Sequence, residues 1–236
     1  MPMFGMFIDP MYLAFLLPGF LLAAWATFKV KSNFAYYSRV RSSSGLTGAD
    51  AARKILQRNA IYDVQVVETQ GMLSDHYDPS KKVVRLSPEV YRTPSVAAVA
   101  IAAHEVGHAL QHANNYAPLS LRSAAVPAAR IGSYAPWIIV IGGFVMHSLS
   151  LVYLGVILFS ATVLFQLITL PVEFNASARA KEQLTSLGMV SRSDAAGVSK
   201  VLSAAAMTYV AAALTAVLTL LYFLMRLGLL GGRNDD

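Results

Sequence analysis

Three long stretches of the chain contain no charged side chain, and this feature limits the possible fold more than any other. The uncharged runs cover residues 10–28, 131–172 and 201–225 of the 236 residues. A helix needs about 20 apolar residues to cross the hydrocarbon core of a bilayer, so these runs suffice for several crossings. Only 14% of the residues are charged, whereas soluble domains carry about 25%. The composition therefore excludes an ordinary soluble domain, and its apolar content excludes a disordered chain.

Four membrane-spanning helices account for these runs. The first span, at 10–28, has no Lys or Arg before it, which favours an uncleaved anchor over a signal peptide. The middle run is 42 residues long, which gives room for two crossings, at 131–147 and 150–171. The last span covers 202–225. Small residues in these spans favour close helix contacts, so we expect them to allow a homo-oligomer or association with another membrane partner.

Two charged stretches, 29–130 and 172–201, connect the spans. The longer one contains 13 Lys or Arg and 7 Asp or Glu, and the shorter one also has a positive excess. With four spans both stretches lie on one side of the membrane, and their positive excess predicts that this side is the cytoplasm. We therefore expect a protein of the bacterial-type inner (plasma) membrane. Its basic residues are scattered rather than clustered, so no nucleic-acid partner is indicated.

The longer charged stretch predicts a small α+β domain inserted between the first and second spans. Thr47 is predicted to cap a helix, and the Val-rich segments 63–68 and 82–86 are predicted to be strands. Residues 95–112 predict an Ala- and Val-rich helix whose uncharged part is too short to cross a membrane. The expected fold class is thus a mainly α-helical integral membrane protein with about four transmembrane helices. The shorter stretch, 172–201, is expected to be a cytoplasmic helical segment.

The chemistry of the chain centres on the motif His104-Glu105-Val106-Gly107-His108. Residues four apart on a helix lie on one face, about 6 Å apart along the axis, so both imidazoles can bind one zinc ion. Glu105 is rotated by about 100° from His104 and can reach a water bound to the metal. The chain has no cysteine, so His, Asp or Glu must hold any metal. Two ordinary core histidines would leave Glu105 buried without a partner, which is costly.

A catalytic zinc ion normally takes a third protein ligand, and the residues leave its identity open. His112 lies on the same helix face, but it is about 12 Å from His104 along the axis and cannot share one ion with it. The metzincin pattern, with a third His ten residues after the first, is absent. Glu173, which follows an apolar span, is one candidate. His76, in a polar segment expected to be a loop, is the other.

Four stretches of the chain are longer and far more specific than the five-residue motif: Leu-Ser-Asp-His-Tyr-Asp-Pro at 73–79, Ala-Ala-His-Glu-Val-Gly-His-Ala-Leu-Gln-His at 102–112, Thr-Leu-Pro-Val-Glu-Phe-Asn-Ala-Ser at 169–177 and Ala-Ala-Ala-Met-Thr-Tyr-Val at 204–210. Through these stretches the chain, from Gly45 onwards, resembles the YugP-like membrane zinc metallopeptidases. The resemblance implies zinc ligands at His104, His108 and Glu173, with Glu105 as the catalytic residue.

The layout is also distantly similar to the HtpX-like membrane proteases. Those proteins carry an acidic residue four positions after their ligand Glu, and Ser177 occupies that position here. Asn175, two residues after Glu173, is a candidate for orienting a ligand instead.

These features predict an endopeptidase with one catalytic Zn²⁺ ion. Zinc lowers the pKa of its water and polarises the scissile carbonyl, while Glu105 is expected to take the water proton and deliver it to the leaving amine. The oxyanion needs a further donor, and the candidates are His76, Tyr77, Tyr116 and Arg179. The strand at 82–86 is either a place where a substrate backbone pairs by strand addition or an interior strand of the sheet. The expected substrates are membrane-proximal or unfolded proteins and peptides, cleaved next to the lipid bilayer on the cytoplasmic side.

Two other interpretations compete with the peptidase. A non-hydrolytic membrane scaffold or adaptor with structural zinc needs four protein ligands, with His76 as the candidate fourth. Glu105 argues against it, because a structural site has no use for a base. A zinc transporter needs ionisable side chains inside the spans, and only His147 comes near one.

Overall fold

The computed structural model describes residues 10–132 and 134–229, and it divides into two compact units. The helical unit consists of Met1–Trp25, Leu121–Leu170 and Thr208–Asp236. The mixed unit, which contains helices and a sheet, consists of Ala26–Ser120 and Pro171–Met207. The three long helices of the chain each contribute residues to both units.

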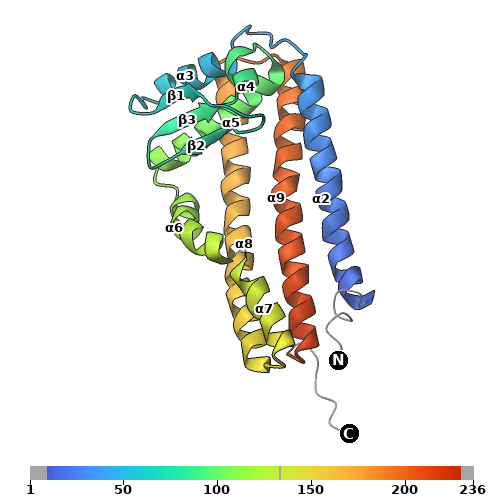
Figure 1. Ribbon diagram of the computed structural model, residues 1–236. Helices are drawn as coiled ribbons and strands as arrows, with labels where there is room; N and C mark the ends of the chain where they lie inside the picture. Colours follow the sequence, from blue (N-terminus) through green and yellow to red (C-terminus); the bar gives the residue numbers. More distant parts are fainter. Residues whose placement is uncertain (1–9, 133, 230–236) are drawn as a thin grey trace. The chain divides into compact units, whose positions relative to one another are not determined.

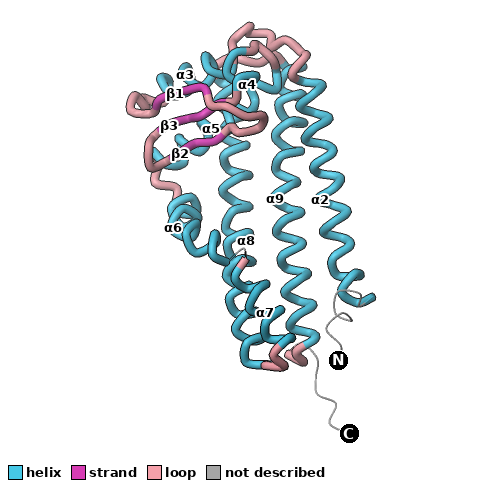
Figure 2. The backbone as a smooth tube through the Cα atoms, in the orientation of Figure 1, coloured by secondary structure: helices cyan, strands magenta, loops and turns pink. Residues whose placement is uncertain are grey.

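Helices dominate the described residues, and a small sheet accompanies them (Figures 1 and 2). The helices are α2 (Pro10–Tyr37), α3 (Gly48–Arg58), α4 (Pro88–Arg92), α5 (Val96–Ala113), α6 (Ala117–Gly132), α7 (Ala135–Val145), α8 (Leu149–Ser186) and α9 (Arg192–Arg226). The strands are β1 (Gln65–Glu68), β2 (His76–Asp78) and β3 (Val83–Leu86).

Among the described residues, three helices are long and apolar enough to cross a membrane: α2, α8 and α9. The fourth span expected at 131–147 is not confirmed, because α7 has only 11 residues. At a rise of 1.5 Å per residue it reaches about 16 Å, roughly half of the hydrocarbon core. Pro136 lies in the first turn of α7, where its missing N–H costs no helical hydrogen bond. Ser133, inside the expected span, lies outside the described residues.

The long helices continue well past the expected ends of the spans. We expected a span at 150–171 and a separate segment at 172–201, but α8 runs on through Pro171 to Ser186. The expected segment ends inside α9, which also contains the whole span expected at 202–225. Charged residues mark where a helix leaves the apolar layer, but they do not end it, because Lys, Arg and Glu are good helix formers.

The helical unit is held together by close helix contacts and aromatic packing. A Cβ built on Gly19 of α2 would collide with the Thr215 hydroxyl oxygen of α9, so these two helices touch at a glycine. The Tyr12 and Tyr222 rings lie 4.9 Å apart between centroids. Large apolar side chains elsewhere in the unit remain exposed, such as Phe20 and Ile157. Exposed apolar side chains on long apolar helices are typical of a lipid-facing surface.

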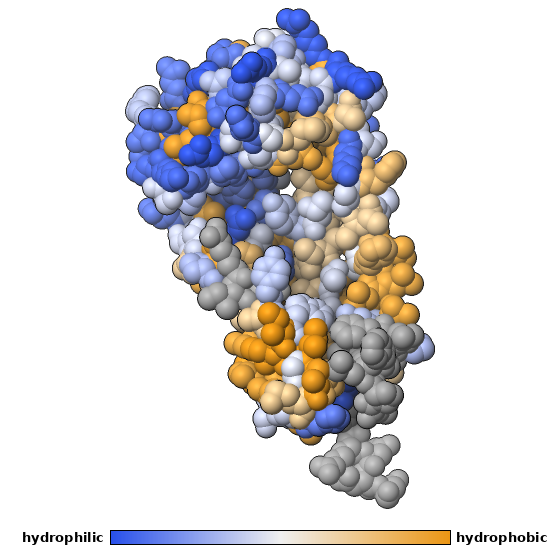
Figure 3. Space-filling model, in the orientation of Figure 1, coloured by the Kyte–Doolittle hydropathy of each residue, from blue (hydrophilic) through white to orange (hydrophobic). Residues whose placement is uncertain are grey.

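The mixed unit is built around α5, whose Ala- and Val-rich sequence lets neighbouring elements approach closely. Its buried core includes Ile55 and Leu56 of α3, Val84 and Leu86 of β3, Val99 and Val106 of α5, and Leu184 of α8. The surface over the sheet and α3 is mostly hydrophilic (Figure 3). The helix cap predicted at Thr47 is confirmed, because its side chain and that of Asp50 form a reciprocal capping box. The buried helix expected at 95–112 is likewise confirmed as α5.

The sheet has the order β1-β3-β2. β1 pairs with β3 in parallel, and β2 pairs with β3 antiparallel. The two predicted strands are confirmed as β1 and β3, whereas β2 was expected to be a polar loop. Because β3 is hydrogen-bonded on both sides, the alternative of an interior strand at 82–86 is confirmed, and the alternative of substrate addition to this strand is wrong. Within the described sheet, the strands with a free edge are β1 and β2.

Candidate metal centre

Helix α5 carries the two histidines of the motif on one face. The helix begins after Ser95, whose side chain accepts a hydrogen bond from the Ala98 amide at 3.1 Å. The rings of His104 and His108 follow one turn apart, with centroids 4.9 Å from each other. Glu105 lies between them in sequence and is 8% exposed. The motif is thus held on a rigid, buried helix rather than on a loop.

Helix α8 brings Glu173 to the same place because it touches α5 at Gly107. A Cβ built on Gly107 would lie 2.5 Å from the backbone oxygen of Ala176, closer than real Cβ atoms come. Ala176 is three residues beyond Glu173, so it lies about one turn further along α8. The glycine inside the motif therefore allows the close helix contact that lets Glu173 reach the histidines.

Replacing Gly107 by alanine is expected to push α8 away from α5. We expect about 1–3 kcal/mol of lost stability from overpacking and a zinc dissociation constant raised about 10–100-fold. Thermal unfolding and competition with a chromophoric chelator measure the two effects. The matched control is Gly142→Ala in α7, where a Cβ would meet nothing within 4 Å. Equal zinc affinity in Gly107→Ala and wild type would contradict this role.

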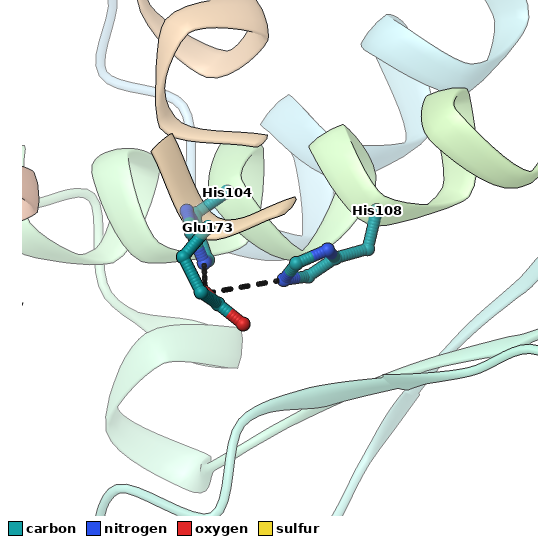
Figure 4. Close-up of side chains that lie close together, drawn as sticks. All are labelled: His104, His108 and Glu173. Carbon is teal, nitrogen blue, oxygen red and sulfur yellow. Dashed lines mark hydrogen bonds and ion pairs between the residues drawn. The ribbon is translucent and has the colours of Figure 1, made fainter. Parts of the chain in front are cut away.

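Three potential ligand atoms converge at the crossing (Figure 4). Glu173 Oε2 lies 3.2 Å from His104 Nε2 and 3.6 Å from His108 Nε2. Atoms offered by the three residues all lie within 4.8 Å of one another. Glu173 is 2% exposed, and burying a carboxylate this deeply requires a cation or hydrogen-bond donors beside it. Two imidazoles and one carboxylate are also the ligand set of one class of catalytic zinc site. The residues therefore fit a zinc ion.

The electrostatic environment favours a cation at this site. Burial alone would lower the pKa of His108, but its hydrogen bond with Glu173 and the charge of Glu105 outweigh burial and raise that pKa. The carboxylates that stabilise an imidazolium ion also attract a divalent metal, which would replace the proton. The pKa of Asp75 is also raised, mainly by burial and in addition by the negative charge of Glu105.

Each histidine turns its other ring nitrogen towards a polar side chain. His104 Nδ1 lies 3.1 Å from the Ser177 hydroxyl oxygen, and His108 Nδ1 lies 3.0 Å from Gln111 Oε1. In metal sites such contacts orient the histidine ring, and here they leave the two Nε2 atoms facing Glu173. Ser177 stands where the HtpX-like proteins have an acidic residue, and it contacts His104, one of the predicted ligands. Gln111 was not predicted, although its position three residues after His108 places it on the same helix face.

The other predicted site residues lie outside this three-residue cluster. His76 is exposed on β2, and its Nδ1 donates to the backbone oxygen of Ser74 at 2.8 Å. The Tyr77 hydroxyl instead meets His112 Nδ1 at 2.8 Å. Tyr116 follows α5 in a short connection, with its backbone N–H bonded to Gln111. Arg179 donates from Nε to Asn175 Oδ1 at 2.8 Å.

Comparison with known proteins decides the family. Residues 12–228 match a protein family described as "Putative neutral zinc metallopeptidase". The chain belongs to this family. A curated relative from Bacillus subtilis (strain 168), "Putative membrane protease YugP", is 53% identical over 215 residues, which cover 91% of this chain and 95% of that protein. No solved structure gives a significant match. The resemblance expected from the sequence is therefore confirmed, and membership of this zinc metallopeptidase family implies zinc as the metal.

Proposed function

We propose that the protein is a membrane-bound zinc endopeptidase whose metal ligands are His104, His108 and Glu173 and whose general base is Glu105. The observation that carries this proposal is the convergence of the three ligand side chains from two helices beside a buried Glu105. Family membership supports a peptidase, and a relative named as a membrane protease supports a membrane location. The three long apolar helices support that location independently.

The residues of the chain divide the work of peptide hydrolysis among them. Zinc, when bound, supplies a Lewis acid that polarises a carbonyl and acidifies water. Glu105 takes the proton of the attacking water and then delivers it to the leaving amine, so that the amine departs neutral. Its burial strengthens these charge interactions, because little water competes with them. The proposed metal ligands His104 and His108 lie on the same helix as Glu105, and the helix therefore fixes the position of the base relative to the metal.

An oxyanion donor besides the metal is still required. Arg179 is bonded to Asn175 and Tyr77 to His112, so both already have structural partners. His76 is exposed on an edge strand, but its Nδ1 proton points to Ser74. It can therefore donate to an oxyanion from Nε2 only as imidazolium. We propose His76 first and Tyr116 second as the side chain that donates a hydrogen bond to the oxyanion.

The competing scaffold requires a closed zinc site with four protein ligands. In the part of the chain that the structure describes, the metal-binding cluster contains three residues, and His76 is not among them. An open fourth position is what a catalytic zinc site needs for water or substrate. This observation favours the peptidase over the scaffold.

Substrates are proposed to be cleaved near the cytoplasmic membrane surface rather than within the bilayer. Glu173 is the first charged residue after the uncharged run 131–172, so the metal site belongs to the end of a span. Membrane-proximal and unfolded segments are the polypeptides that can reach such a position.

The test is to incubate the zinc-loaded protein with a model substrate that has one spanning helix and unstructured flanks. Cut positions are then mapped by mass spectrometry. We expect cuts in the flanks within a few residues of the membrane. Cuts deep inside the spanning helix would contradict the interfacial location, and the absence of any cut would contradict the peptidase.

A further inference from the structure

A glutamine is buried at the crossing of the two helices that supply the metal ligands. Gln111 of α5 has 0% of its surface exposed. Its Oε1 lies 3.0 Å from His108 Nδ1, and its Nε2 lies 2.7 Å from the Val172 backbone oxygen and 3.0 Å from Asn175 Oδ1. One side chain thus contacts a ligand of α5 and two polar groups of α8. A buried amide with this many partners is satisfied in only one orientation.

Two independent groups on α8 impose that orientation. The Val172 backbone oxygen can only accept a hydrogen bond, so the Gln111 atom facing it must be the NH₂ group. Arg179 can only donate, so Asn175 must turn its carbonyl oxygen towards Arg179 Nε. The same Asn175 oxygen faces Gln111 and again requires the NH₂ group there. Both anchors therefore turn Gln111 Oε1 towards His108.

The orientation of Gln111 decides which nitrogen of His108 carries a proton. Because Oε1 is an acceptor, His108 Nδ1 must be the donor in their contact. The lone pair of a neutral His108 then lies on Nε2, the nitrogen that faces Glu173. His104 differs, since the Ser177 hydroxyl can rotate to donate or to accept and sets no tautomer.

We propose that Gln111 is a positioning residue that holds His108 with its proton on Nδ1 and its Nε2 ready for the metal, in an orientation imposed by Val172, Asn175 and Arg179. The inference rests on the metal site of the proposed function. It gives α8 two tasks, because the helix that supplies Glu173 also prepares His108. It also gives Arg179 a role away from the substrate, and it connects Asn175 to a ligand through Gln111.

Two substitutions separate positioning from simple packing. Gln111→Met keeps the length of the side chain but removes every hydrogen bond, and it is expected to raise the zinc dissociation constant about 10–100-fold. Gln111→Glu also loses NH₂ donors that fix the orientation through α8, yet in either protonation state it offers His108 an acceptor oxygen. The loss of zinc affinity in Gln111→Glu is therefore expected to be clearly smaller than that in Gln111→Met. The matched control is Gln183→Met on α8, where Gln183 Oε1 accepts a hydrogen bond from Asn59.

The measurement is zinc competition with a chelator, using the full chain in detergent. Equal losses of affinity in Gln111→Met and Gln111→Glu would show a packing role and overturn the proposal. Wild-type affinity in Gln111→Met would overturn it too.

A second measurement remains decisive even if the methionine variant does not fold. In zinc-loaded wild-type protein labelled with ¹⁵N-histidine, we expect an imidazole Nδ1–H of His108 that exchanges slowly with water. Zinc bound through Nδ1 of His108, or an Nδ1–H that exchanges as fast as in a free imidazole, would overturn the proposal. Zinc binding without any hydrolysis would contradict the proposed function alone, because neither readout depends on catalysis.

Discussion

Glu105→Gln is expected to reduce peptide hydrolysis by about 10²–10⁴-fold, the usual contribution of general acid–base catalysis. Glutamine has the same shape as glutamate, but its amide cannot accept the proton of the attacking water. The metal ligands are unchanged, so zinc content should equal that of wild type. The measurement is kcat/KM on a fluorogenic peptide, with bound zinc determined in the same sample.

The matched control is Glu182→Gln, the same chemical change at an exposed position of α8. Its activity should equal that of wild type. If Glu105→Gln retained full activity with zinc bound, Glu105 would not be the base. If it lost zinc together with activity, the residue would serve the metal rather than the water.

Glu173→Ala is expected to raise the zinc dissociation constant about 10²–10³-fold. Four-ligand structural zinc sites bind with about 10–16 kcal/mol, so one ligand contributes about 2.5–4 kcal/mol. The loss should be large here because Glu173 is the anionic member of the cluster and contacts both histidines. Competition with a chelator of known affinity measures it.

Glu182→Ala, on the exposed side of the same helix, controls for the helix itself and should bind zinc like wild type. An unchanged dissociation constant in Glu173→Ala would remove Glu173 from the ligand set and reopen the choice of the third ligand. Together, the Glu105 and Glu173 variants separate loss of the base from loss of the metal.

The chemistry of the site was predictable where it depends on local spacing. The two histidines are one helical turn apart, so their common face follows from the geometry of any helix, and the same geometry rotates Glu105 by about 100° from His104. The residues alone left the third ligand open between Glu173 and His76, and the family resemblance indicated Glu173. Glu173 reaches the histidines because Gly107 contacts the backbone of Ala176. This contact could not be predicted, because the two residues are far apart in the sequence.

The number and ends of the spans were less predictable. An uncharged run shows which part of the chain is apolar enough to lie in a membrane, but it does not show where a helix begins or ends. The run 131–172 therefore suggested two spans, whereas the structure has the short α7 and a single long α8. The strand β2 was missed because it has only three residues, fewer than the four to eight over which alternation of apolar and polar residues predicts a strand.

The side-chain network around Gln111 was not predictable, because it joins residues that are more than 60 positions apart in the chain. Gln111 by itself is an ordinary polar residue near the end of a helix. Its importance follows only from full burial together with three contacts of defined polarity.

The measurement that tests the central claim most directly is hydrolysis of an unstructured protein as a function of zinc bound per chain. Metal-free protein in detergent is titrated with zinc, and newly formed α-amino groups are counted at each step. We predict that the rate rises in proportion to bound zinc and levels off at one ion per chain. Stoichiometric zinc binding with no hydrolysis at any point would contradict a catalytic site and favour the structural one.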